Sequence, residues 1–352
     1  MANVDMTAYG LTGRLAALAR EKKGSWTVGR VLLQERGLYR IVSEAGEQMA
    51  EVSGRLRHEA KGAADFPAVG DFVWMEGEAG QGNAIIQGIL PRRSVFVRRA
   101  AGAGCAEQVV AANIDTVFIC MALNGDFNLR RLERYLAVAW DSGAVPAVVL
   151  TKADLCDDVP RRLLEVGEAA PGVELLTVSA VEPEGWRALL PLIGRGRTVA
   201  LIGSSGVGKS TLINRLLGEE RLETNGLRSD DRGRHTTTRR ELFLLKTGGM
   251  VIDTPGMREL GLWTVDSGVE QSFADIEALA AECRFRNCSH TGEPGCAIQK
   301  ALDEGALSVN RLQSYRKLCA ESRYAGDAEG YLAEKKEKFK QIAKINRSAR
   351  RK

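Results

Sequence analysis

The chain has 352 residues, of which 44% are hydrophobic and 27% charged, and its formal net charge is +4. This length is too great for one ordinary core and predicts two or three domains, and the composition is that of a soluble globular protein. No apolar run approaches the roughly 18 residues that cross a bilayer, and the amino terminus lacks the features of a secretory signal, so we expect a cytoplasmic protein without membrane association.

The first predicted elements are short strands. Five segments within residues 25–98 combine β-branched and aromatic residues with Gly-containing turns between them, namely residues 26–34, 38–43, 49–54, 71–76 and 84–90. This pattern predicts a small barrel or sandwich. Arg residues intervene at positions 30, 36, 40, 55 and 57. A small barrel with exposed Arg suits nucleic-acid binding, although such barrels serve many purposes.

From about residue 105 the pattern changes to alternating strands and helices. Apolar runs at 115–121, 146–150, 174–178, 198–203, 241–246 and 250–253 are typical of buried strands. Asn128 is a good N-cap for a helix over 128–143, and residues 210–218 predict another helix that ends at Gly218. This alternation predicts a mostly parallel sheet covered by helices.

After Trp263 the predicted strands stop. Residues 272–282 and 308–322 predict helices, and a Cys/His cluster lies between them. Residues 331–352 hold six Lys and three Arg against two Glu, which indicates either contact with a polyanion or a solvated tail. We therefore expect three domains over residues 1–100, 101–262 and 263–352.

Residues 203–210, GSSGVGKS, fit the phosphate-loop pattern G-x-x-x-x-G-K-[ST] between a strand and a helix. In such a loop the backbone N–H groups face phosphate oxygens, Lys209 reaches the β and γ phosphates, and the Ser210 hydroxyl binds Mg²⁺. The predicted contacts come from Gly203, Ser204, Ser205, Gly206, Val207, Gly208, Lys209, Ser210 and Thr211.

The segment VIDTPG at 251–256 ends a buried strand with a carboxylate. Asp253 suits a hold on Mg²⁺ through water, and Gly256 can offer its N–H to a γ-phosphate. Alone, Asp-Thr-Pro-Gly is also an ordinary turn. Its position after the phosphate loop favours the nucleotide interpretation.

The base-reading loop is predicted at TKAD, residues 151–154, which follows a strand and resembles the N-K-x-D loop of GTPases. Asp154 can accept two hydrogen bonds from guanine, which favours GTP over ATP, and the Lys152 stem can lie over the base. Thr151 stands where Asn is usual, which puts one polar contact in doubt. TVSA at 177–180 resembles the supporting loop, with Ser179 and Ala180 near the base. TKAD by itself is equally a helix cap.

The base-reading loop precedes the phosphate loop, which is the reverse of the usual order. The phosphate-loop and base-reading interpretations are compatible if the GTPase domain is circularly permuted. Circular permutation is tolerated because chain termini usually lie at the surface, often close together. The segment leaving DTPG then runs directly into the carboxyl-terminal region.

The cluster CRFRNCSHTGEPGC supplies Cys283, Cys288, His290 and Cys296. Three thiolates and one imidazole form a closed set that is typical of one structural zinc ion. Free core thiols beside a surface His are the alternative. Arg284 and Arg286 between the ligands suit RNA phosphate.

The order TKAD, TVSA, GSSGVGKS, GRHTTT and DTPG, with a barrel before it and a Cys/His cluster after it, resembles the RsgA/YjeQ family of circularly permuted, small-ribosomal-subunit-dependent GTPases. The resemblance implies a multidomain α/β protein with an N-terminal OB-fold β-barrel, a permuted P-loop GTPase domain and a C-terminal zinc-binding helical domain. It also implies binding to the small (30S-type) ribosomal subunit and its rRNA during late maturation, with Mg²⁺ bound alongside GTP or GDP. We expect a monomer.

The water-positioning Gln of many GTPases corresponds here to Met257, so intrinsic hydrolysis is expected to be slow. The resemblance points to His235 as the catalytic residue, and an imidazole can orient water near neutral pH. A loop His touching RNA or solvent is the alternative. Thr237 is the expected second hydroxyl on Mg²⁺, with Thr236 and Thr238 left open.

Three functions compete at this point. The first is a GTP-driven RNA-binding assembly factor that is stimulated by the small subunit. The second is a GTP-dependent switch for a protein partner without direct rRNA binding, and the third is a static RNA-binding protein with a degenerate GTPase domain. The complete phosphate loop argues against the third.

Overall fold

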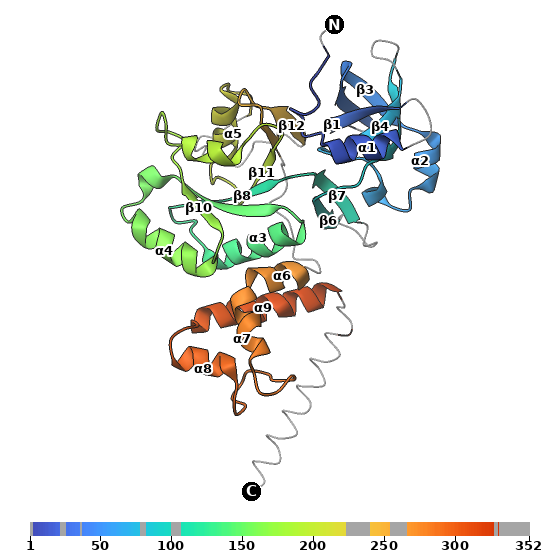
Figure 1. The fold of residues 1–352 in the computed structure, drawn as a ribbon. Coiled ribbons are helices and arrows are strands. Elements are labelled where there is room, and N and C mark those ends of the chain that lie inside the picture. Colours follow the sequence, from blue (N-terminus) through green and yellow to red (C-terminus); the bar gives the residue numbers. More distant parts are fainter. Residues whose placement is uncertain are drawn as a thin grey trace, which may run out of the picture. The chain divides into compact units, whose positions relative to one another are not determined.

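The computed structural model describes residues 3–21, 26–35, 37–77, 82–99, 107–222, 240–253, 266–326 and 330 (Figure 1). The chain divides into two compact units, one formed by residues 1–135 and 142–260 and the other by residues 136–141 and 261–352. Across the described ranges, no helix has both the length and the apolar character needed to cross a bilayer.

The amino-terminal part of the first unit is a five-stranded barrel. Its strands pair in the order β1-β2-β3-β5-β4, and β4 returns to pair with β1 and close the barrel. This is the strand order of an OB-fold, so the predicted barrel is confirmed. The elements are α1 (Gly13–Arg20), β1 (Thr27–Glu35), β2 (Leu38–Ser43), β3 (Gly46–Val52), α2 (Gly54–Glu59), η1 (Ala63–Asp65), β4 (Phe72–Glu76) and β5 (Ala84–Ile89).

A two-stranded hairpin of β6 (Val95–Arg99) and β7 (Glu107–Ala112) follows the barrel, and a six-stranded α/β sheet comes next. The elements of this sheet and its helices are β8 (Thr116–Ala122), α3 (Leu129–Asp141), β9 (Val145–Thr151), η2 (Ala153–Leu155), α4 (Val159–Ala169), β10 (Glu174–Thr177), η3 (Arg187–Leu192), β11 (Thr198–Ile202), α5 (Lys209–Leu217), β12 (Glu241–Leu244) and β13 (Met250–Asp253). Helices α3 and α4 cover one face of the sheet and α5 covers the other (Figure 1).

The spatial order of these strands differs from their order in the chain. The sequence β10-β9-β8-β11-β13-β12 places β11 between β8 and β13, although β11 follows β10 in the chain. The pairs β10–β9, β9–β8, β8–β11 and β11–β13 are all parallel. The loops that follow β9, β10, β11 and β13 therefore emerge at the same carboxyl edge, where ligands bind in open α/β sheets.

The local signals in this region agree with the structure. Strand β8 is buried along its whole length, as its continuous apolar run predicts. The Asn128 side chain accepts a hydrogen bond from the backbone N–H of Arg131 at 3.0 Å, which is the predicted N-cap. Helix α5 ends at Gly218, whose φ of 74° is the left-handed conformation that glycine adopts at little cost.

The barrel and the α/β sheet are joined through a buried arginine. Strand β1 pairs with β12, with Leu33 opposite Glu241, so the two sheets are continuous. Beside this joint Arg30 is fully buried, which contradicts the expectation that it is exposed. Its guanidinium lies over the Phe72 ring and donates to oxygens or sulfur of Tyr9, Gly70, Asn113, Thr198 and Met250. Burial lowers the pKa of Arg30 to about 9, so the side chain still carries its charge at neutral pH.

Replacing Arg30 by Met is expected to destabilise the first unit by about 3 kcal/mol, because several buried carbonyl oxygens lose their donor. The matched control is Arg40→Met, since Arg40 is part-exposed in its ion pairs, and it should cost less than about 1 kcal/mol. Urea unfolding of both variants measures the difference. Equal stability of the two variants would contradict a structural role for the buried guanidinium.

The second unit is helical over the residues that the structure describes. It contains α6 (Asp266–Ser272), α7 (Ala274–Ala281), α8 (Ala297–Asp303) and α9 (Val309–Gly326). Helices α7 and α9 match the two predicted helices, whereas α6 and α8 have seven residues each and were not predicted. Arg311 of α9 donates to both carboxylate oxygens of Asp275 at 2.7 Å and stacks over Phe273, which ties α9 to α7.

Candidate functional site

The loop between β11 and α5 has a backbone conformation that favours glycine at three positions. Gly203, Gly206 and Gly208 have φ values of 144°, 75° and 98°. A Cβ atom on Gly203 would lie 2.3 Å from the carbonyl oxygen of Cys120 on β8, so no side chain fits there. The loop turns directly into the amino terminus of α5, where backbone N–H groups and the helix dipole favour an anion.

Lys209 holds this loop closed on itself. Its Nζ donates to the carbonyl oxygen of Gly203 at 2.8 Å and to that of Ser204 at 2.6 Å. The Lys209 ammonium group is thereby held against the loop. The strand, glycine loop and helix predicted at this position from the sequence are present in the structure.

The two predicted base-reading segments lie together. The Ser179 hydroxyl donates to the Asp154 carboxylate at 2.7 Å, and the Ala153 N–H donates to the Val178 carbonyl oxygen at 3.2 Å. Lys152 adopts a left-handed φ of 58°, which turns the chain sharply out of β9. The Asp154 carboxylate is thus oriented by a neighbouring loop, as a group that reads a ligand must be.

Thr151 connects the base-reading loop to the phosphate loop. Its buried hydroxyl donates to the backbone carbonyl of Val207 at 2.6 Å, a contact between residues 56 positions apart in the chain. The residue that departs from the N-K-x-D pattern therefore makes a polar link between the two loops. Its effect on the contact with the base stays a prediction.

A residue that the sequence analysis did not single out lies at the same edge. Asp126, in the loop after β8, accepts a hydrogen bond from the Ser204 hydroxyl at 2.6 Å. The position of Asp126 just after β8 could have indicated this location. Strand β8 is parallel to β9 and β11, so the loop after it lies at the same edge as the loops after those strands.

Asp253 is the last residue of β13, next to β11, so its backbone lies at this edge as predicted. The remaining predicted residues His235, Thr237 and Gly256 lie outside the described residues, as do Thr236, Thr238 and Met257.

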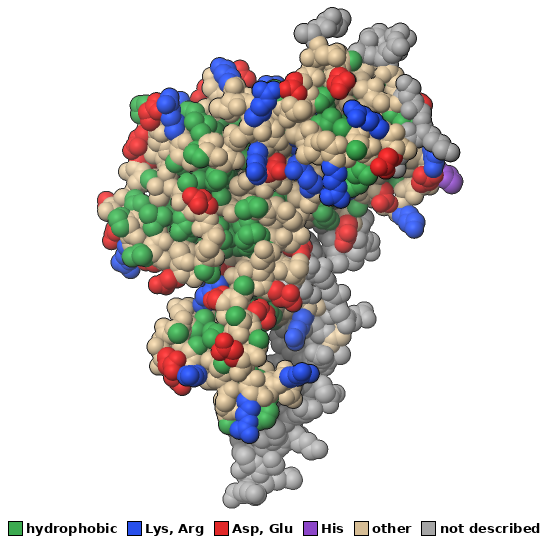
Figure 2. Space-filling view, viewed as in Figure 1, with side chains coloured by type: hydrophobic (Ala, Val, Ile, Leu, Met, Phe, Trp, Pro, Cys, Tyr) green, Lys and Arg blue, Asp and Glu red, His purple; other side chains and the backbone are tan. Residues whose placement is uncertain are grey.

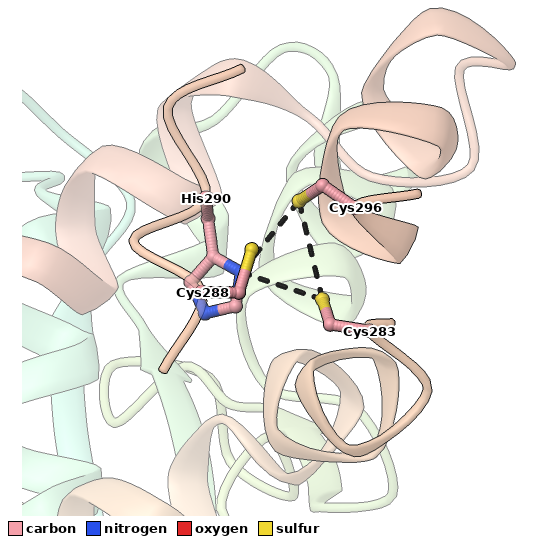
Figure 3. Close-up of side chains that lie close together, drawn as sticks. All are labelled: Cys283, Cys288, His290 and Cys296. Carbon is pink, nitrogen blue, oxygen red and sulfur yellow. Dashed lines mark hydrogen bonds between the residues drawn. The ribbon is translucent and has the colours of Figure 1, made fainter. Parts of the chain in front are cut away.

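The Cys/His cluster forms a compact donor set in the second unit (Figure 3). The three Sγ atoms of Cys283, Cys288 and Cys296 and one ring nitrogen of His290 all lie within 4.8 Å of one another. The His290 Nδ1 is 3.5 Å from the Cys283 Sγ and 3.6 Å from the Cys296 Sγ, and these two sulfurs are 4.0 Å apart. The backbone N–H of Gln299 also donates to the Cys296 sulfur.

The three distances among Cys283, His290 and Cys296 are close to those of a tetrahedral metal site. Bonds of about 2.3 Å to sulfur and about 2.05 Å to nitrogen give edges of about 3.8 Å between sulfurs and about 3.6 Å from sulfur to nitrogen. The prediction of a metal-binding group at these four residues is confirmed.

A phosphate loop and a base-reading loop on one edge of a sheet with permuted connections define a circularly permuted P-loop GTPase. The RsgA GTPase family model matches residues 89–263. The chain is 49% identical to small ribosomal subunit biogenesis GTPase RsgA 2 of Lactiplantibacillus plantarum, covering 92% of this chain and 91% of that protein. It is 50% identical to the RsgA of Opitutus terrae, covering 84% and 83%. The chain belongs to the RsgA GTPase family.

Solved structures agree with this fold. The crystal structure of YjeQ from Thermotoga maritima has a TM-score of 0.63 at 22% identity and covers 84% of this chain and 97% of its own. The structure of YloQ, a circularly permuted GTPase, has a TM-score of 0.62 at 21% identity and covers 86% and 97%.

Proposed function

We propose that this protein is a GTPase that binds the small ribosomal subunit and hydrolyses GTP during late maturation of that subunit. The observation that carries the proposal is the link between Thr151 and Val207, which joins the loop for the base to the loop for the phosphates. The names of the relatives, small ribosomal subunit biogenesis GTPases, support the choice of partner.

In this proposal the backbone of residues 203–208 and Lys209 bind the phosphates. Asp154 accepts the two guanine donors, Lys152 lies along the base, and Ser179 and Ala180 support it. Ser210 and Thr237 would hold Mg²⁺ directly, Asp253 would hold it through water, and Gly256 would donate to the γ-phosphate. When bound, Mg²⁺ supplies charge neutralisation on the phosphate oxygens.

The hydrolysis step needs a group that orients water. We assign this role to His235, because Met257 stands where many GTPases carry Gln and a thioether cannot orient water usefully. Turnover of the isolated protein is therefore slow, and the ribosomal subunit completes the arrangement.

The metal-binding group holds one structural zinc ion, because the four donors leave no open position for a substrate. Arg284 and Arg286 between the ligands are exposed and suit rRNA phosphates. On the face drawn in Figure 2, positive and negative side chains of the described residues are interspersed. We assign part of the RNA affinity to residues 331–352, which carry six Lys and three Arg against two Glu. The protein works in the cytoplasm as a monomer.

The test is GTP turnover with and without purified small subunits, with ATP as the control nucleotide. Turnover should rise by roughly two orders of magnitude or more with subunits, and His235→Ala should keep GTP affinity but lose the stimulation. Stimulation by a protein extract free of rRNA would favour a switch for a protein partner instead. Normal stimulated turnover by the His235→Ala variant would rule out the catalytic assignment.

A further inference from the structure

The loop after β8 places a carboxylate in hydrogen-bonding contact with the phosphate loop. Asp126 Oδ2 accepts from the Ser204 hydroxyl at 2.6 Å, and Asp126 Oδ1 accepts from the Arg131 guanidinium at 2.8 Å. Arg131 also donates to the Asp126 carbonyl oxygen, and the Asp126 N–H donates to the Asn124 side chain at 3.0 Å. Both carboxylate oxygens are occupied, so the orientation of the carboxylate is fixed.

Asp126 is ionised, and its charge is balanced locally. Burial raises the pKa of Asp126. The hydrogen bonds from Ser204 and Arg131, together with the positive charges of Arg131 and Lys152, lower that pKa by more than burial raises it, so it lies below the usual value. Because Arg131 pairs with the carboxylate, the negative charge behind the loop is compensated and its repulsion of a polyphosphate is reduced.

The phosphate loop is thus held at two of its residues. Thr151 binds the loop at Val207 from β9, and Asp126 binds it at Ser204 from the loop after β8. Ordering a free loop costs roughly 1–2 kcal/mol per residue, and this cost reduces ligand affinity when it is met on binding. Two tethers that order the loop beforehand remove part of that cost.

We propose that Asp126 is a positioning residue for the nucleotide, which acts through Ser204 to hold the phosphate loop in its binding conformation before GTP or GDP arrives. The inference rests on the proposed GTPase function and extends it. Asp126 does not touch the reacting atoms. Its loss therefore changes affinity and leaves the chemical step intact.

The expected result for Asp126→Ala is a roughly 5- to 30-fold weaker affinity for GTP and for GDP alike, because one charge-assisted hydrogen bond that orders the loop is lost. Turnover at saturating GTP should stay within about two-fold of the original protein. Asp126→Asn keeps an acceptor oxygen for Ser204 and should recover most of the affinity.

The experiment is a double-mutant cycle with Asp126→Ala, Ser204→Ala and the two together, read as equilibrium affinity for fluorescent GTP and GDP. If the pair acts as one unit, the double variant loses no more affinity than either single variant. Glu168→Ala, an exposed carboxylate on α4, is the matched control and should bind normally. Thermal unfolding of each nucleotide-free variant reports on folding separately.

Unchanged affinity of Asp126→Ala, or losses that multiply in the double variant, would overturn the inference. A lower melting temperature with unchanged affinity would do the same, because it marks a purely structural role. Failure of the unaltered protein to bind GTP would instead refute the proposed function, so the two failures are distinguishable.

Discussion

Removal of the metal from Cys283, Cys288, His290 and Cys296 is expected to unfold the segment that joins α7 to α8. The four donor atoms lie within 4.8 Å of one another, and a bound cation would hold them together. Structural zinc contributes an apparent binding free energy of about 10–16 kcal/mol in isolated finger peptides. We expect a stabilisation of roughly this order for the segment between α7 and α8. Helical signal lost on chelation, measured by circular dichroism together with zinc content, checks the prediction.

The matched variants are Cys288→Ser and Cys156→Ser. Cys288 is one of the four ligands, whereas Cys156 lies in the other unit. Only Cys288→Ser should lose zinc and the associated helical signal. Purified protein that holds its secondary structure at zero zinc content would contradict a structural metal.

Replacement of Asp154 by Asn is expected to weaken GTP binding by about 10²–10⁴-fold. In the proposed GTP complex the carboxylate accepts two hydrogen bonds from guanine, and each charge-assisted bond is worth about 1.5–3 kcal/mol. The side-chain NH₂ group of the variant would face the exocyclic amine of guanine. Both groups are donors, so one hydrogen bond is replaced by a repulsive contact. Xanthine has a carbonyl oxygen at that position and accepts from the amide, so XTP affinity should rise.

The measurement is competition of GTP, XTP and ATP for the variant. The control is Ser179→Ala, which removes the hydrogen bond that orients the carboxylate but leaves its charge. It should weaken GTP binding by roughly ten-fold and leave the base preference unchanged. Undiminished GTP binding by Asp154→Asn would show that the base is read elsewhere.

Much of the site could be predicted because its chemistry is local. The phosphate loop needs glycines at fixed offsets before a helix, and Gly203, Gly206 and Gly208 have the backbone angles that require them. The metal group follows equally from the spacing of its ligands, since a short loop holds all four. Here neighbours in sequence are neighbours in space, so a pattern in the sequence suffices.

The contacts that join distant segments could not be predicted in this way. Arginine is usually exposed, yet Arg30 is buried, because three backbone carbonyl oxygens and one threonine hydroxyl from four other segments accept hydrogen bonds from it. Asp126 and Ser204 are 78 positions apart, and nothing in either segment indicates the partner.

The sequence by itself determined the family of the chain from the order of its motifs. It determined the glycine loop before α5 and the metal group from short-range spacing. The tertiary structure decided how these parts are linked, namely Thr151 to Val207, Asp126 to Ser204 and Arg30 to the strands of the α/β sheet. The physical reason is the strand order, since placing β11 between β8 and β13 sets which loops meet at one edge.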